Sequence, residues 1–436
     1  MSRNFTAGLM RFGYVVLSYF LTPLVFLFLL KKGFSNRGYW DRLEERLGFG
    51  KARSTKPSIW VHAVSVGEVQ AAAPLVRALM ERMPGMPVVI TTMTPTGSDR
   101  ARALFGDTVM HSFVPYDLPG AVSRFFDRLN PRLAVIMETE IWPNLYHECG
   151  RRRIPLVMAN ARVSEKSVKK YKLMVELFRR TLSHGIVIAA QSQQDASRFL
   201  SIGSNPARTH VVGNIKFGFE LSEELAEQGR AFRNAFAPDR PVWLAASTHA
   251  GEEELVLEAH ARVQSRSPRS LLILVPRHPE RFDGIAAMVK QAGLSCRRRS
   301  LAETPEESTD VFLLDTLGEL LMFYSASDVA FVGGSLVPIG GHNLLEPASL
   351  GVPVVVGPHN FNAQDVTDLF LAAQAMRVVE GPAGLAGQVV ALFENAAARQ
   401  ELAAAAFAVL DQNRGTVDRL LGLLEPMLLE RFPDAS

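Results

Sequence analysis

The sequence predicts an α/β protein with two doubly wound domains, each a parallel sheet with helices on both faces. Two observations support this prediction. Short, continuous apolar runs, each followed by a turn and a helical pattern, occur six times between the N-terminal segment and residue 217 and six more times beyond residue 240. Such runs are typical of strands buried on both faces, as in parallel sheets. A polar stretch over residues 219–241 separates the two sets and predicts a boundary near residue 225.

The composition is that of a globular protein: of 436 residues, 47% are hydrophobic and 21% are charged. A chain of this length is too long for one compact core, which agrees with two domains. The net charge of +3 gives no reason to expect a nucleic acid as a partner. Cys149 and Cys296 lie far apart and lack the spacing of metal ligands, so we expect no disulfide framework and a reducing compartment.

The first element is an uncharged apolar segment over residues 12–30, with Arg11 before it and Lys31 and Lys32 after it. As a helix it would be about 28 Å long, close to the hydrocarbon thickness of a bilayer, so we expect a membrane anchor over residues 1–32. Its length and the lack of a cleavage site disfavour a signal peptide, while a buried helix of a soluble domain is the alternative. Pro23 can kink the helix, which leaves a shallow insertion open beside a full span.

The part of the chain beyond the anchor is expected on the cytoplasmic side, because residues 31–56 hold eight Lys or Arg and three acids. We expect a first domain over residues 33–225, a second over 226–410 and a helical tail over 411–436. In sheets of this kind, ligands bind beyond the carboxyl ends of the strands, and two facing edges enclose a cleft. The side chains that follow each strand are therefore the candidate site residues.

The first domain offers charged side chains at three of its expected strand ends. Glu68 follows the first strand and Gly67 at a helix start, where it either complements the helix dipole or takes a proton from a substrate; the residues leave both open. Glu138 ends the third strand, and a buried carboxylate there needs a cation or a ligand hydroxyl, whereas Glu140 can be a local cap. Lys216 ends the sixth strand, either as a surface residue or as a point charge for a phosphate or carboxylate.

In the second domain, Arg277 and His278 follow the apolar strand that ends at Pro276. A guanidinium matches a phosphate bidentately, which favours Arg277 as an anion ligand over an ordinary surface residue. His278 can equally be a capping or packing residue. Gly318 and Glu319 stand at another expected helix start, where backbone N–H groups are free.

The most informative stretch, residues 331–358, predicts a strand, a glycine-rich loop, a short helix and a strand. Two pairs, Gly333-Gly334 and Gly340-Gly341, permit a close approach of the backbone to a ligand. We expect a helix beginning near Asn343 to direct its N–H groups at an anion, and Glu346 to accept hydrogen bonds from ribose hydroxyls. The alternative is a tight connection between two elements and nothing more.

Several common sites are missing from the sequence. No G-x-G-x-x-G follows the first strand of either domain, which disfavours a nicotinamide dehydrogenase, and no P-loop motif occurs. No D-x-D or histidine-rich ligand set occurs either. We therefore expect neither a metal ion nor a cofactor.

Taken in order along the chain, these motifs resemble the 3-deoxy-D-manno-octulosonic acid (Kdo) transferases. Those are the membrane-anchored glycosyltransferases that place Kdo on the lipid A precursor of Gram-negative bacteria. The likeness covers nearly the whole chain. Its motifs are "HAVSVGEV", "TTMTPTG", "METEIWPN", "NARVS", "GNIKF", "VPRHPERF", "LGEL" and "GGHNLLEPASLGVPVVVGP".

The resemblance implies a GT-B glycosyltransferase: two Rossmann-like domains with a cleft between them, the donor CMP-Kdo on the C-terminal domain and the acceptor lipid IVA on the N-terminal one. It implies an inverting, metal-independent transfer at the cytoplasmic side of the inner membrane. It further implies that Glu68 is the general base and that Glu138 and Lys216 stabilise the transition state. The CMP-binding positions that it implies are Pro276, Arg277, Gly318, Glu319, Leu320, Asn343, Leu344, Leu345 and Glu346.

A basic segment supports a membrane surface as a partner. Residues 161–180 carry seven basic and two acidic side chains, and residues 150–155 add three arginines. A solvated basic helix is the ordinary interpretation. Beside an anchor and with a phosphorylated lipid as acceptor, attraction to anionic headgroups is the better one.

Two rival functions remain open at the level of the residues. One is another GT-B enzyme, either a nucleotide-sugar transferase of peptidoglycan synthesis or a sugar-nucleotide epimerase. Thermal protection by CMP or CMP-Kdo, and not by UDP-sugars, separates it from a Kdo transferase. The other is a tethered protein that holds a nucleotide without turnover, which a product assay with lipid IVA excludes or supports.

Overall fold

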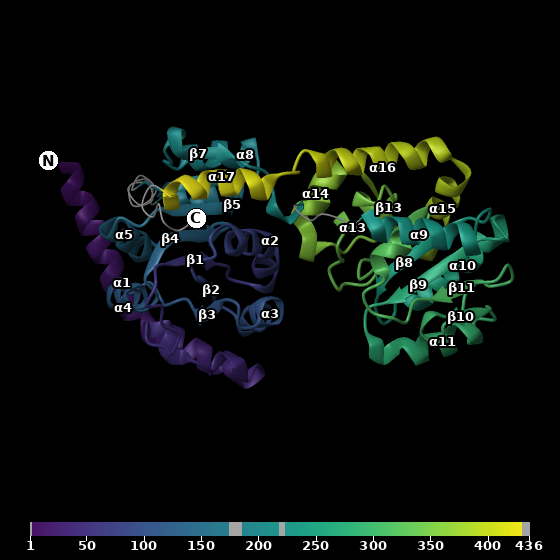
Figure 1. Ribbon diagram of the computed structural model, residues 1–436, viewed down its shortest axis with the longest axis horizontal. Coiled ribbons are helices and arrows are strands. Elements are labelled where there is room, and N and C mark those ends of the chain that lie inside the picture. The colour runs from purple at the N-terminus through teal and green to yellow at the C-terminus, as the bar shows by residue number, and fades with distance from the viewer. Residues whose placement is uncertain (1, 174–184, 218–222, 430–436) are drawn as a thin grey trace. The chain divides into compact units, whose positions relative to one another are not determined.

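The computed structural model describes residues 2–173, 185–217 and 223–429. The chain divides into two compact units: unit 1 holds Met1–Phe219 and Asn413–Ser436, and unit 2 holds Glu220–Gln412. Each unit is built on a seven-stranded parallel sheet flanked by helices (Figure 1). The predicted fold class, two doubly wound α/β domains, is therefore confirmed.

The sheet of unit 1 has the strand order β3-β2-β1-β4-β5-β6-β7, with every neighbouring pair parallel. The order reverses between β1 and β4, the switch point beside which ligands bind in doubly wound sheets. Alternate residues of β1 enter different cores, Ile59 and Val61 on one face and Trp60 on the other. The strands are β1 (Ser58–His62), β2 (Val88–Thr92), β3 (Met110–Phe113), β4 (Pro131–Met137), β5 (Leu156–Ala161), β6 (Val187–Ala190) and β7 (Thr209–Val211).

The helices of unit 1 cover both faces of this sheet, as the two separate cores require. Several begin at a capping side chain, such as Ser65, whose hydroxyl accepts the N–H of Glu68. The helices are α1 (Ser2–Ser35), α2 (Val66–Arg82), α3 (Pro95–Phe105), α4 (Pro119–Leu129), α5 (Pro143–Arg152), α6 (Glu165–Leu173), α8 (Gln193–Ser201) and α17 (Thr416–Leu429).

Unit 2 has the strand order β10-β11-β9-β8-β12-β13-β14, again with parallel neighbours. Two buried clusters lie on its opposite faces, one with Trp243 and the other with Leu244 of the same strand. The strands are β8 (Val242–Thr248), β9 (Leu271–Pro276), β10 (Cys296–Arg298), β11 (Val311–Leu313), β12 (Val329–Val332), β13 (Val354–Val356) and β14 (Met376–Val378).

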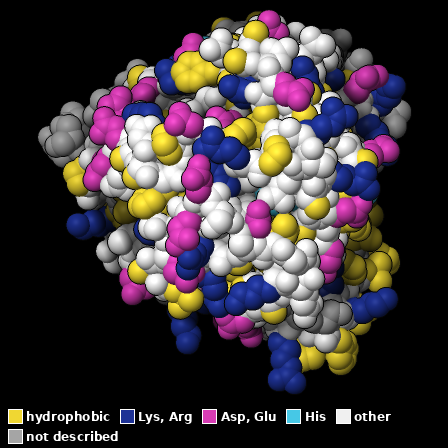
Figure 2. All heavy atoms as spheres, turned by 90° about the vertical axis from the view of Figure 1, so that its right-hand side faces the viewer, with side chains coloured by type: hydrophobic (Ala, Val, Ile, Leu, Met, Phe, Trp, Pro, Cys, Tyr) yellow, Lys and Arg dark blue, Asp and Glu magenta, His cyan; other side chains and the backbone are white. Residues whose placement is uncertain are grey.

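The helices of unit 2 alternate with these strands along the chain, as predicted for a parallel sheet. They are α9 (Glu223–Phe236), α10 (Glu253–Arg266), α11 (Phe282–Gln291), α12 (Leu320–Ser325), α13 (Leu345–Ser349), α14 (Gln364–Ala372), α15 (Gly381–Glu394) and α16 (Ala396–Asp411). On the face of the molecule drawn in Figure 2, Lys and Arg side chains are intermixed with Asp and Glu, in keeping with the small net charge of +3.

The domain boundaries differ from the expected ones at two places. The expected boundary between residues 225 and 226 falls inside α9, a helix whose Phe232 packs in a core of unit 2. The expected tail over residues 411–436 is not a separate element, because α17 returns to unit 1 and buries Leu420 and Leu424 in the core beside α2. The six predicted strands per domain are present, and each sheet has one further strand at its edge, β3 and β10.

The apolar N-terminal segment forms one helix, α1, with Pro23 inside it. Within the part of the chain that the structure describes, its stretch Arg11–Phe34 is the one helix long and apolar enough to cross a membrane. Residues 174–180 of the expected basic segment lie outside the described residues.

Candidate active site

Glu68 lies in the first turn of α2, directly beyond the carboxyl end of β1. One carboxylate oxygen accepts the backbone N–H of Val64 at 2.9 Å, and the other accepts the hydroxyl of Ser65 at 3.1 Å. Ser65 also caps the helix by accepting the N–H of Glu68. This reciprocal arrangement resembles a capping box, so the local helix-end role weighed from the sequence is present.

The surroundings of Glu68 favour its protonated form. Burial raises its pKa to about 7, the negative charges of Glu138 and Glu140 add to this, and the hydrogen bonds from Val64 and Ser65 act in the opposite direction. Glu68 forms no ion pair with any described residue. A carboxyl group that titrates near neutral pH can both take up and release a proton, which is the property of a general base.

Glu138 and Lys216 come together at the same edge of the sheet, although 78 positions separate them in the sequence. The Lys216 Nζ lies 3.7 Å from one carboxylate oxygen of Glu138, and the Arg162 Nε lies 3.3 Å from the other. Glu138 therefore has two cations beside it, in line with the expectation that its carboxylate needs a cation or a ligand.

The local backbone around this pair differs from the expected strands. β4 ends at Met137, and Glu138 has a φ of 55°, which turns the chain away from the sheet. Glu138 and Glu140 thus do not share a strand face, and Glu140 accepts the indole N–H of Trp142. Lys216 lies in a 3₁₀ turn, Ile215–Phe217, because β7 already ends at Val211.

In unit 2, Arg277 follows β9, and its backbone N–H donates to the Thr248 carbonyl of the neighbouring strand at 3.0 Å. Its side chain is exposed and forms no ion pair with the described residues. Three imidazoles lie beside it. The rings of His249 and His342 stack with their Nε2 atoms 2.8 Å apart, and His278 meets His249 edge-on with ring centroids 5.1 Å apart.

The pKa values of two of these histidines, His249 and His342, are lowered, which favours their neutral forms. Burial, and then the neighbouring His249 and Arg277, lower the pKa of His342 to about 4. The pKa of His249 is lowered for the same reasons, burial first and then the charge of His278. His249 and His342 therefore present neutral imidazole groups near the exposed guanidinium of Arg277, a combination suited to an anion and its hydroxyl neighbours.

The glycine-rich loop is held by Glu252, a buried residue just before α10. Its carboxylate accepts the N–H groups of Gly334, Ser335 and Leu336 at 2.6, 3.1 and 2.9 Å. A Cβ atom at Gly333 would lie 2.7 Å from the carbonyl oxygen of Ala246 in β8 and 2.8 Å from the Glu252 carboxylate, so only glycine fits. The loop is thus fixed to β8 from within unit 2.

The helix after this loop is short, as expected, but it begins two residues after Asn343. α13 begins at Leu345 and spans five residues, so it provides no extended dipole at Asn343. Instead, the Asn343 side chain accepts the N–H of Leu345 at 3.1 Å and donates to the carboxylate of Glu346 at 3.0 Å. Leu344 and Leu345 are buried, so their side chains are not available to a ligand.

Gly318 and Glu319 were expected to offer free backbone N–H groups at the start of a helix, but the side chain of Glu319 has partners of its own here. The Glu319 carboxylate accepts hydrogen bonds from the Arg299 guanidinium, the shortest at 2.6 Å, and from the Thr316 hydroxyl. The hydrogen bond from Arg299 holds the pKa of Glu319 below its usual value. Gly318 is exposed with a φ of 88°, and Leu320 packs against a core of unit 2.

Sequence reasoning missed several residues that shape these sites. Arg162, Glu252 and Arg299 act on predicted residues from distant positions, and no local pattern marks them. His249 could have been found, because it follows β8 as Arg277 follows β9. His342 stands directly before Asn343 in the motif that was singled out.

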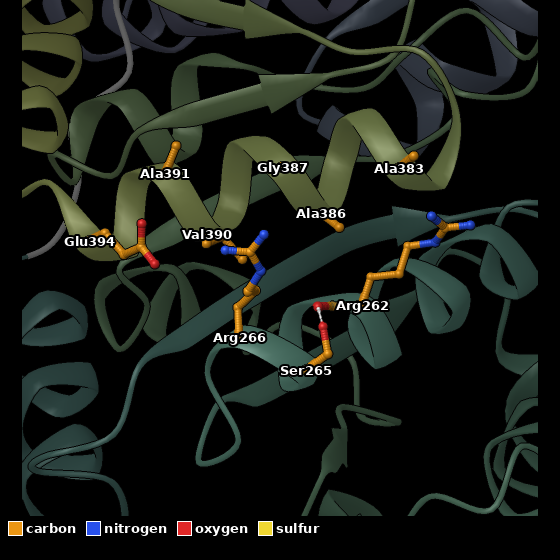
Figure 3. Close-up of a pocket in the computed structure, with 9 residues that line it drawn as sticks. All are labelled: Arg262, Ser265, Arg266, Ala383, Ala386, Gly387, Val390, Ala391 and Glu394. Atoms are coloured by element: carbon orange, nitrogen blue, oxygen red, sulfur yellow. Dashed lines mark hydrogen bonds between the residues drawn. The ribbon is translucent and has the colours of Figure 1, made fainter.

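A groove of about 460 Å³ lies elsewhere in unit 2, between α10 and α15 (Figure 3). Arg266 reaches across it toward Val390 and Glu394, while Ala386 and Gly387 line it with small groups. None of the predicted site residues lines this groove.

Two parallel doubly wound sheets, each with charged side chains at its carboxyl edge, define the GT-B class of glycosyltransferase folds. The similarity to solved structures agrees with this class. UDP-GlcNAc 2-epimerase from Neisseria meningitidis bound to UDP-GlcNAc matches 86% of this chain and 100% of its own with a TM-score of 0.53. At 14% sequence identity that likeness concerns the fold alone.

The family follows from the sequence relatives. Residues 41–219 match the family model of the 3-deoxy-D-manno-octulosonic-acid transferases (kdotransferases). The 3-deoxy-D-manno-octulosonic acid transferase of Haemophilus influenzae is 42% identical over 96% of this chain and 99% of its own length. That of Bordetella pertussis is 38% identical over 94% and 97%. The chain belongs to the Kdo transferase family, and the resemblance noted from the motifs is confirmed.

Proposed function

We propose that this Kdo transferase moves Kdo from CMP-Kdo to lipid IVA, with inversion at the anomeric carbon and with Glu68 as the general base. The observation that supports it most is the carboxyl group of Glu68, which titrates near neutral pH, lies beyond the switch-point strand and forms no ion pair with any described residue. A base of this kind contributes roughly 10²–10⁴-fold to a rate.

The proposed step is a single displacement. An acceptor sugar hydroxyl gives its proton to Glu68 while its oxygen bonds to the anomeric carbon of Kdo. The bond between that carbon and the phosphate oxygen breaks on the opposite side, and CMP leaves with the electron pair as a phosphate monoester. No metal or cofactor takes part in the proposal. Lys216, held beside Glu138, supplies positive charge that stabilises the developing negative charge.

We assign CMP to the carboxyl edge of the sheet of unit 2. Arg277 is exposed and unpaired among the described residues, so its guanidinium is available to the phosphate. Asn343 and Glu346 offer an amide and a carboxylate to ribose hydroxyls. Because Glu319 is held by Arg299, we assign its role to positioning the adjacent Gly318 backbone, with the base or sugar of the nucleotide as its neighbour.

We place the enzyme at the cytoplasmic face of the inner membrane, anchored through α1, because its proposed acceptor is a lipid. An anionic membrane surface is the expected further partner. The stretch Arg11–Phe34 supports the anchor by its length and hydropathy.

The test is incubation with CMP-Kdo and lipid IVA, followed by mass spectrometry of the lipid. We expect Kdo-modified lipid IVA from the wild-type protein. In the Glu68→Gln variant we expect the rate to fall by about 10²–10⁴-fold while CMP-Kdo binding is retained. Glu81→Gln, at an exposed position of the same helix, is the matched control and should act as wild type. More than about a tenth of the wild-type rate in Glu68→Gln would exclude it as the base.

A further inference from the structure

One face of α1 is covered along its whole apolar length. Side chains that are buried or half-buried recur every three or four residues, the spacing of a single helix face. They are Arg11, Tyr14, Val15, Ser18, Thr22, Val25, Phe26, Leu29 and Gly33. The hydroxyls of Ser18 and Thr22 donate to carbonyls of the preceding turn, so this face carries no unsatisfied hydroxyl.

The covering surface belongs to unit 1, and it begins at α5 and the loop before α4. Arg11 contacts His147 of α5, with 2.6 Å between Nη1 and Nε2. The Tyr14 hydroxyl donates to the buried carboxylate of Asp117 at 2.9 Å. Figure 1 shows α1 running along the flank of unit 1 past α5 and α4.

The contacts continue to the other end of the helix. The ring of Phe26 meets Tyr116 edge-on with centroids 5.8 Å apart. The indole N–H of Trp40 donates to the Leu30 carbonyl at 3.0 Å. The helix thus contacts unit 1 near its start and through Phe26, and the turn that directly follows the helix folds back onto its end.

The opposite face of α1 is apolar and uncovered. Phe20 and Phe34 are 81% and 82% exposed, and no charged residue occurs between Arg11 and Lys31. A continuous apolar surface of this extent marks an interaction with a membrane or with another protein. Its large exposed members are Phe12, Val16, Leu17, Tyr19, Phe20, Leu21, Leu24, Leu27, Phe28, Leu30 and Phe34.

A spanning helix does not fit these contacts. The stretch Arg11–Phe34 has 24 residues and is therefore about 36 Å long, enough to cross the whole hydrocarbon layer. If it crossed while fastened to unit 1, Asp117 and His147 would enter the hydrocarbon with it. Burying charged and polar groups there costs several kcal/mol each. A helix that lies along the membrane keeps every contact and needs no such burial.

We propose that α1 lies in the plane of one membrane leaflet, with its exposed apolar face in the acyl chains and its other face on unit 1. The proposal rests on the membrane placement of the proposed function, and it chooses between the two insertions that the sequence left open. The occupant of the apolar face is a bilayer with anionic headgroups. Lys31 and Lys32 at the end of the helix fit this, since Lys32 lies over the rings of Phe28 and Tyr39 and can hold its charge at the headgroup level.

The first test is the side of the membrane on which residue 2 lies. In the Cys296→Ser background, with Cys149 buried, the variants Ser2→Cys and Lys56→Cys are treated with a membrane-impermeant maleimide. Lys56 is exposed in unit 1 and reports its side. We expect both variants to react in inverted vesicles and neither in intact spheroplasts. Reaction of Ser2→Cys from the outside would show a spanning helix and overturn the proposal.

The second test measures depth along the helix. Nitroxide labels are attached in the variants Phe12→Cys, Phe20→Cys and Phe28→Cys, reconstituted with phosphatidylethanolamine and phosphatidylglycerol vesicles. An in-plane helix gives similar, shallow depths for all three labels by oxygen and nickel-chelate accessibility. A maximum depth at position 20 would indicate a span, and three labels shielded without lipid would indicate a second copy of the chain. Either outcome overturns the proposal, and neither bears on Kdo transfer, because no turnover is measured.

Discussion

Both carboxylate oxygens of Glu68 accept hydrogen bonds from residues at the start of α2, Val64 and Ser65, and its pKa is nevertheless raised to about 7. Because burial raises its pKa in the folded protein to about 7, the folded state binds the proton more tightly than the unfolded chain does. The stability that this protonated group provides is complete below its unfolded pKa, and it is lost as the pH rises toward 7.

We therefore predict that Glu68→Gln changes the pH dependence of stability. Between about pH 4.5 and about pH 7, the free energy of unfolding of the variant should rise relative to that of the wild type. Above about pH 7 the difference should stay constant. Urea unfolding at a series of pH values measures this. Glu81→Gln, at an exposed position of the same helix, is the control. A constant difference for Glu68→Gln over the range would mean that the pKa of Glu68 is not raised.

Lys216 gives a second prediction at the scale of the residue. Its charge lies 3.7 Å from Glu138, whose other oxygen keeps Arg162, so Lys216→Met leaves the carboxylate with one cation. We expect kcat to fall by about 10²–10³-fold, as for the loss of one group that stabilises developing charge. Steady-state kinetics with CMP-Kdo and lipid IVA test this. The control is Lys290→Met, an exposed lysine on α11; an equal loss in both variants would argue against a specific role.

A site residue could be predicted where its role follows from its position after a strand. It could not be predicted where its role depends on a contact with a distant part of the chain. Glu68, Glu138 and Arg277 follow strands, and the rule that ligands bind beyond the carboxyl ends of strands is enough to single them out. Arg299 acts on Glu319 through a contact that no sequence pattern encodes. The backbone turn at Glu138 was equally out of reach, because its positive φ depends on the tertiary structure.

At the scale of the element, one edge strand of each sheet was missed, β3 and β10, whereas the other edge strands, β7 and β14, and all interior strands were predicted. β3 reads MHSF and β10 reads CRR, and each is paired on one side only. Both of these strands are short and carry polar residues, so they lack the continuous apolar run that marks a buried strand. The short helix of the glycine-rich stretch was predicted, and α13 begins at Leu345, two residues after the expected start near Asn343.

The glycine-rich loop gives a prediction for an element. In Glu252→Ala, the N–H groups of Gly334, Ser335 and Leu336 lose their acceptor inside unit 2. Each buried donor left unsatisfied costs about 1–3 kcal/mol, so we expect unit 2 to lose at least about 3 kcal/mol of unfolding free energy. Urea unfolding and amide exchange at the loop measure this.

The control for the loop is Glu254→Ala. Glu254 is exposed and lies in the first turn of α10, the helix that follows Glu252. It should leave both stability and exchange near wild-type values. Unchanged exchange at Gly334 in Glu252→Ala would mean that the loop is held by other contacts.

At the scale of the whole molecule, the two units are interleaved along the chain. Unit 2 is one continuous segment, whereas unit 1 is built from the segments before and after it. Sequence reasoning could not anticipate this, since the residues of α17 carry an ordinary helical pattern that does not say which core they join. The structure joins them to α2 in unit 1. Arg82 of α2 pairs with Glu425 at 2.7 Å, and the Arg419 guanidinium donates to the Val212 carbonyl at 2.8 Å.

This interleaving predicts opposite outcomes for two truncations. A chain that ends at Gln412 loses four leucines from the core of unit 1, and burying each contributes roughly 1.5–3 kcal/mol, a sum comparable with the whole stability of a domain. We therefore expect unit 1 to unfold in that chain. The segment 220–412 alone should fold and unfold in one transition. The leucines are Leu420, Leu421, Leu424 and Leu428.

The milder variant Leu424→Ala keeps the tail and separates packing from simple loss of chain. It should destabilise unit 1 by about 2–5 kcal/mol and leave the transition of unit 2 unchanged, as followed by urea unfolding of the full chain. If Leu424→Ala shifted the transition of unit 2 instead, α17 would support the other unit. The integrity of the Glu68 site would then not depend on the C-terminal end of the chain, contrary to what the packing of α17 beside α2 indicates.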